Sequence, residues 1–234
     1  MNWRARYEAG EYEAVWDEMQ KASPLEGALQ DEATEVATFT MRRVRRNVAI
    51  LSKRLRQHGW LALYDDLHTP ACDDFTTTIK AIEARINGPI PLALRMFWQI
   101  VGSVNFVWDY NFDPDYKHIG FDVDLLDLDP FCIDPPRLLA TIEEDWRQRE
   151  DGGWLHNGSQ YPIELAPDHY HKANVSGGDS YKVFAPSLDV DPLFDAELCA
   201  LSFTNYLRLA FRWAGFPGLC EHRDDPDVQA FVNK

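Results

Sequence analysis

The chain has 234 residues, of which 38 are acidic and 23 basic, and its formal net charge is −15. This negative charge repels phosphate backbones and anionic lipid, so we expect neither nucleic acid nor a membrane surface as a partner, and a basic protein fits better. Hydrophobic residues make up 45% of the chain and aromatic residues 13%, which is enough apolar surface to build a core and argues against global disorder.

Two further patterns favour a cytoplasmic protein. No stretch approaches the roughly 18 apolar residues of a membrane-spanning helix, and no apolar run follows the arginines near the N-terminus. The four cysteines lie far apart and form no C-x-x-C pair, so we expect reduced thiols without zinc. They are Cys72, Cys132, Cys199 and Cys220.

The first 62 residues are predicted to form a helical extension. Helix-like spacing in the first twenty residues predicts one short helix. Ser23-Pro24-Leu25-Glu26 has the form of a capping box and predicts that a long helix begins at Pro24, while His58-Gly59 predicts its end. Its apolar positions alternate in steps of four and three: Ala37, Met41, Val44, Val48, Leu51 and Leu55.

The long helix also carries a basic face, formed by Arg42, Arg43, Arg45, Arg46, Lys53, Arg54 and Arg56. These cations could contact RNA, but in an acidic chain we favour ion pairs with the protein's own carboxylates. A further hypothesis makes the extension a dimerisation arm, with an apolar seam formed by Met41, Val44, Val48 and Leu51.

A turn-rich passage at residues 65–70 predicts a boundary, followed by a second domain at residues 73–234. Asp73 or Asp74 can cap a helix that ends at Asn87-Gly88-Pro89, and Pro91 begins another that ends before Gly102. Further helices are predicted at 134–151 and 203–214, and strands at 104–110, 161–165 and 181–184. Because strands and helices do not alternate strictly, the pattern favours an α+β fold with flanking helices.

Two aspartate-rich segments resemble each other. Residues 126–131 read LDLDPF and residues 188–193 read LDVDPL, and each is predicted to be a strand that leads into a turn. Asp122, Asp124, Asp127 and Asp129 lack the glycine of an EF-hand loop, so we expect solvated strand carboxylates rather than a calcium site.

Residues 167–181 carry the densest set of chemically versatile side chains. Gly177 and Gly178 can adopt a positive φ at a hairpin turn, and His169 and His171 would share one face of an extended segment. Two histidines lack the further ligands that zinc needs, and the phosphate-loop and nucleophile-elbow motifs are absent. We therefore predict no metal, no cofactor and no covalent catalysis.

The passage from Ile79 to Gly102 resembles the opening of the SUKH superfamily. A helix carrying Glu83 precedes a short link that ends in Ile90-Pro91, and a second helix with an aromatic residue ends at Gly102. The resemblance covers residues 73–215. It implies an α+β domain with a mixed, curved sheet that serves as a protein-binding scaffold, as in yeast regulators of cell-wall synthesis and bacterial immunity proteins that neutralise toxins.

We therefore predict a non-enzymatic, toxin-neutralising protein that binds and occludes a basic partner. The predicted contact residues are Trp108, Tyr110, His169, His171, Lys172, Asn174, Ser176, Gly177, Gly178, Asp179 and Tyr181. The alternative is a small-molecule or metal-dependent enzyme built on the side chains of His169, His171, Lys172 and Asn174.

Overall fold

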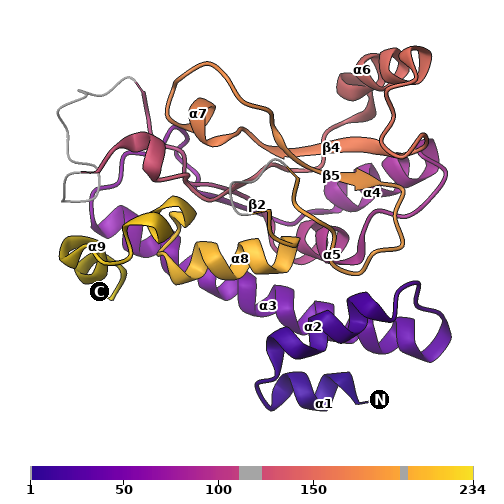
Figure 1. Ribbon diagram of the computed structural model, residues 1–234, viewed down its shortest axis with the longest axis horizontal. Helices are drawn as coiled ribbons and strands as arrows, with labels where there is room; N and C mark the ends of the chain where they lie inside the picture. The colour runs from indigo at the N-terminus through magenta and orange to yellow at the C-terminus, as the bar shows by residue number, and fades with distance from the viewer. Residues whose placement is uncertain (1, 111–122, 196–199, 234) are drawn as a thin grey trace.

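The computed structural model describes residues 2–110, 123–195 and 200–233 (Figure 1). Its elements in chain order are α1 (Trp3–Glu8), α2 (Tyr12–Lys21), α3 (Gly27–Gln57), β1 (His68–Pro70), α4 (Asp73–Arg85), α5 (Leu92–Ile100), β2 (Gly102–Asn105), η1 (Leu125–Asp127), β3 (Cys132–Ile133), α6 (Leu139–Gly152), β4 (Tyr161–Ala166), α7 (His169–Lys172), β5 (Tyr181–Ala185), α8 (Phe203–Arg212), η2 (Pro217–His222) and α9 (Pro226–Val232). Small antiparallel sheets flanked by helices confirm the α+β class.

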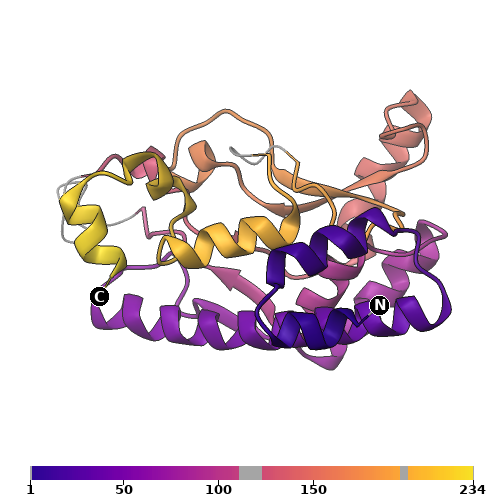
Figure 2. The same cartoon turned by 60° about the horizontal axis from the view of Figure 1, so that its bottom comes forward.

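The long helix α3 runs along the base of the molecule, beside α1 and α2 and beneath α8 (Figure 2). All six positions of its predicted apolar stripe are buried, and the helix packs on α5 and α1. The apolar stripe therefore belongs to the protein's own core, and the hypothesis that it forms a dimerisation seam is wrong. The division into residues 1–62 and 73–234 remains a prediction.

Local contacts change both ends of the predicted extension. Two helices replace the single short helix, because the chain turns at Gly10, whose φ is +104°. The helix α3 begins at Gly27, and Glu26 makes no capping hydrogen bond. The Ser23 hydroxyl instead donates to the carbonyl oxygen of Leu188 (2.7 Å), so the capping-box prediction is wrong and Ser23 tethers the extension to a distant loop. The helix ends as predicted at His58-Gly59.

The strands form two small antiparallel sheets, in the orders β1-β2-β3 and β4-β5. The backbone N–H of Asp134 donates to Leu165 O (2.6 Å), which connects β3 to β4. The turn-rich passage at residues 65–70, where we predicted a domain boundary, contains the edge strand β1. The strand predicted at 104–110 ends at Asn105, whose side chain accepts a hydrogen bond from Val107 N (2.9 Å). None of the helices in the described ranges is long and apolar enough to cross a bilayer.

The two similar aspartate-rich segments are not strands. The first begins in η1 and continues as irregular structure, and the second lies in irregular structure before α8. The corresponding carboxylates Asp129 and Asp191 are both buried, so the prediction of solvated carboxylates is wrong for Asp129. The carboxylate of Asp191 accepts a hydrogen bond from Thr204 N (2.9 Å) near the start of α8. Of the other aspartates in this prediction, Asp122 lies outside the described residues.

Gly102 shows why the β1–β2 pair needs a glycine. Its φ is +106°, and a Cβ at this position would collide with Thr69 O of the neighbouring strand β1 and with Ala71 N, which follows that strand. We expect Gly102→Ala to lower the free energy of unfolding by about 1–3 kcal/mol more than Gly10→Ala, because only the former adds a backbone clash to the strain of positive φ. Gly10 is a matched control, since its φ is +104° and its Cβ would meet nothing within 4 Å. Equal losses in urea denaturation of the two variants would contradict this account.

Candidate functional site

Asp168 organises the segment between β4 and β5. Its buried carboxylate accepts hydrogen bonds from Tyr170 N (2.8 Å) and His171 N (3.2 Å), and also bonds to the ring Nδ1 of His171. Burial by itself would raise the pKa of Asp168, but these hydrogen bonds lower the pKa below its usual value. Because this cap starts the helix α7, His169 and His171 do not share a face of an extended segment as predicted.

The loop after α7 folds back onto the same carboxylate. Gly178 has a φ of +78°, and a Cβ there would collide with the Asp168 carboxylate. Asn174 also has a positive φ (+61°), and its side chain is exposed. Residues 174–179 therefore form an exposed loop whose base is fixed by α7 and Asp168.

A buried ion pair lies beneath this loop. Lys172 Nζ is 2.6 Å from Asp129 Oδ1, and the two side chains are 0% and 1% exposed. The same ammonium group is 4.4 Å from the centroid of the Tyr181 ring. The pair therefore connects α7, the segment after η1, and β5. Within the described part of the chain, Asp129 Oδ2 has no hydrogen-bond partner.

Asp129 also lines a cavity of about 440 Å³ between η1, α7, α8 and η2. Asp127 and Glu221 add two further carboxylates to its wall, and His169 and Tyr170 line it from α7. The Asp127 Oδ2 atom is 3.0 Å from His222 Nε2. A cavity lined by three carboxylates suits a cationic group. Among the described residues, no group of three or more His, Cys, Asp or Glu side chains is arranged to hold a metal ion.

Several predicted contact residues lie in the core. Trp108, Lys172 and Tyr181 are buried, so their assignment to a contact surface is wrong. Trp108 packs edge-to-face on the half-buried Tyr110, whose hydroxyl donates to His171 O (3.1 Å). The rings of Trp108 and Tyr181 and the charge of Lys172 therefore make contacts inside the protein's own core and do not face a partner. The exposed members of the predicted surface are His171, Asn174, Ser176, Gly177, Gly178 and Asp179.

The four side chains of the enzyme alternative do not converge. Within the described structure, His169 alone of the four lines the cavity. Lys172 points into the core, while His171 and Asn174 are exposed. Concerted acid–base chemistry requires such groups within hydrogen-bonding reach of one substrate, and this arrangement does not provide it.

Sequence reasoning did not single out two exposed apolar residues. Tyr170 is 40% exposed and Val175 is 43% exposed, and Val175 N donates to Tyr170 O (2.8 Å). The sequence signal that could have identified them is the presence of two apolar residues in a polar, glycine-containing loop. The two side chains extend the exposed loop into a surface formed by Tyr170, His171 and residues 174–179, which we call the α7 surface.

Within the described residues, the basic face of α3 forms few of the ion pairs that we expected. Among its seven cations, Arg56 has an ion pair within the described residues, at 3.9 Å from Asp66. The other six have none there. From Val36 to Gln57 the helix contains no acidic residue, so carboxylates would have to come from other elements, and among the described residues only Asp66 pairs with this face.

The chain matches no protein-family model, no curated protein and no solved structure. The resemblance of residues 79–102 to the SUKH superfamily therefore remains a prediction. In the structure, Glu83 Oε1 accepts a hydrogen bond from Ile90 N (3.1 Å) and so fixes the link between α4 and α5.

We expect Lys172→Met to lower the free energy of unfolding by about 3–5 kcal/mol, because it leaves the buried Asp129 carboxylate without its counter-charge. The double variant Lys172→Met/Asp129→Asn should lose less, since asparagine carries no charge and tolerates the positive φ of +41° at this position. Urea denaturation at neutral pH measures both. A double variant as unstable as the single one would show that the unpaired charge is not the cause.

Asp134 gives a prediction about pH. Burial raises the pKa of its carboxyl group, which lies 3.7 Å from the buried Cys132 thiol. The folded state therefore holds this proton more tightly than the unfolded chain, and stability is lost as the pH rises through the raised pKa. We expect Asp134→Asn to stabilise the protein at about pH 7 and to have a smaller effect near pH 4. A stabilisation that does not grow between these pH values, in urea denaturation, would contradict the assignment.

Proposed function

We propose that this chain is a non-enzymatic binding protein that captures and occludes a basic partner protein through the α7 surface, in the manner of a toxin-neutralising protein. One observation carries the proposal: a cavity lined by three carboxylates opens beside an exposed loop whose base is fixed. A lysine or arginine side chain of the partner would enter this cavity.

The α7 surface has the composition of a binding site. Tyr170 and Val175 provide exposed apolar area, and polar loop residues surround them. Aromatic side chains are frequent among the residues that dominate binding energy. Because Asp168 and the Lys172–Asp129 pair already fix the loop's base, little conformational entropy would be lost on association.

Electrostatic interactions favour a basic partner both at long range, during approach, and at short range, in the cavity. The net charge of −15 would steer a cationic protein toward this chain over distances of about the Debye length, and salt would weaken this effect. At short range, the accessible carboxylates at the cavity are those of Asp127 and the exposed Glu221. A basic side chain could therefore form charge-assisted hydrogen bonds there.

Affinity purification from the cells that produce the protein tests the proposal. The wild-type protein and the control Leu138→Ala, which alters an exposed apolar residue at the N-cap of α6, should recover the same basic protein at equal stoichiometry. Tyr170→Ala/Val175→Ala and Glu221→Lys should each lower recovery at least about tenfold, because they remove the apolar anchors or reverse a charge at the cavity.

Circular dichroism should show that all four proteins are folded, since the substituted side chains are exposed. Recovery that both α7-surface variants leave unchanged would refute the proposed binding surface. Recovery of an acidic protein would refute the charge argument.

A further inference from the structure

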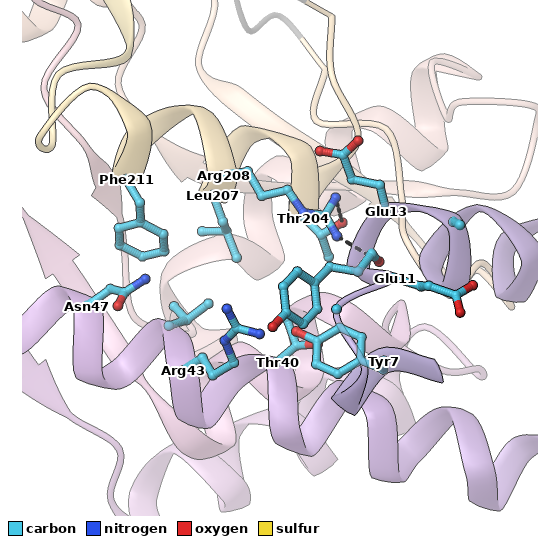
Figure 3. Close-up of a pocket in the computed structure, with 14 residues that line it drawn as sticks. Tyr7, Glu11, Glu13, Thr40, Arg43, Asn47, Thr204, Leu207, Arg208 and Phe211 are labelled. Carbon is cyan, nitrogen blue, oxygen red and sulfur yellow. Dashed lines mark hydrogen bonds between the residues drawn. The ribbon is translucent and has the colours of Figure 1, made fainter. Parts of the chain in front are cut away.

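A second cavity lies across α8 from the first. Leu209 of α8 faces the acidic cavity beside α7, whereas Leu207, Arg208 and Phe211 face the second cavity. Its volume is about 490 Å³, and its other walls are the turn between α1 and α2 and the middle of α3 (Figure 3). This volume lies within the range of small-molecule sites, about 300–1,000 Å³.

Arg43 is the central cation of this second cavity. Figure 3 shows its side chain projecting from α3 toward α8. The guanidinium carbon is 3.9 Å from the centroid of the Tyr12 ring, and the Tyr12 ring packs edge-to-face on that of Tyr7 (4.8 Å). Stacking occupies the flat face of the guanidinium group and leaves its N–H edges free for a bidentate acceptor.

No group of the described chain uses those N–H donors. Arg43 makes no ion pair and no hydrogen bond from its side chain there, although the chain has 38 acidic residues. One turn along α3, the half-buried Asn47 amide also makes no hydrogen bond within the described residues, and it points into the same cavity (Figure 3). Two adjacent polar groups are therefore available to a ligand.

The charges around the second cavity favour a single negative charge on the ligand. Arg208 contributes a second guanidinium, which donates to Tyr12 O (3.2 Å) and to no carboxylate among the described residues. Glu11 lies 2.8 Å from Arg6 Nη2, but Arg6 also pairs with Glu18 (2.6 Å), so Glu11 is only partly compensated, and the exposed Glu13 makes no ion pair there. Arg43 is therefore the cation of this lining that has no hydrogen bond among the described residues, and this single guanidinium beside the Asn47 amide matches a carboxylate better than a dianionic phosphate.

The remaining wall is apolar. Val44 and Leu207 are buried, and the half-buried Phe211 ring points toward Asn47 (Figure 3). An apolar or aromatic group would contact these side chains while a carboxylate reached Arg43.

We propose that this second cavity binds a small organic monocarboxylate that carries an apolar or aromatic group. The carboxylate accepts hydrogen bonds from Arg43 and Asn47, and the apolar group packs on Val44, Leu207 and Phe211. This site is independent of the proposed partner surface, because its residues lie on the opposite side of α8.

Titration of the ¹⁵N-labelled full chain with phenylacetate, followed by NMR, tests the proposal. We expect saturable shifts at α3, α8 and the α1–α2 turn. Arg43→Met should raise the dissociation constant at least about tenfold, because it removes a charge-assisted bidentate contact. The matched control Arg46→Met removes an exposed arginine of the same helix outside the cavity, and it should bind within about twofold of wild type.

Two further measurements make the result decisive. Phenylacetamide, which has the same shape but no charge, should bind at least about tenfold more weakly. Asn47→Leu should also weaken phenylacetate binding, and it serves as a second variant if Arg43→Met fails to fold. Three outcomes would overturn the proposal: no saturation by phenylacetate, equal losses in Arg43→Met and Arg46→Met, or inorganic phosphate binding at the same residues with the same affinity.

Discussion

The buried pair of Lys172 and Asp129 is the interaction on which the region around α7 depends. Transfer of two charges from water to the core is costly, and their attraction offsets that cost only with close geometry and further favourable contacts. Here the close contact to Asp129 Oδ1 and the position of the ammonium over the Tyr181 ring supply both. Because these residues come from three separate segments, the pair requires the chain to close over it in one arrangement.

That arrangement explains why the exposed loop and the cavity lie together. Lys172 ends α7, and Asp168 begins it, so the orientation of this one-turn helix is fixed at both ends. The backbone of Gly178 then returns across Asp168, and Tyr170 is left on the outside between the loop and the cavity. A charge pair in the core thus positions polar and apolar groups at the surface, although none of the core atoms need touch a partner.

The two cavities differ in their charged residues, and α8 separates them. Carboxylates of Asp127, Asp129 and Glu221 line one cavity, whereas the guanidinium groups of Arg43 and Arg208 line the other together with Glu11 and Glu13. Some acidic side chains of the described structure pair with other cations, for example Glu143 and Glu150 with Arg85. Net charge therefore describes long-range steering but not the local sign of either cavity.

The sequence alone determined the elements that depend on local patterns. The stripe from Ala37 to Leu55 predicted the buried face of α3, and the α4–α5 pair, β4, β5 and α8 lie close to their predicted positions. Tertiary contacts decided what periodicity cannot encode. Ser23 bonds to Leu188 instead of capping a helix, Lys172 is buried with Asp129 from 43 residues away, and Arg43 pairs with no carboxylate of the described segments. Burial, pairing and isolation of charges depend on which distant segments meet, and spacing along the chain does not contain that information.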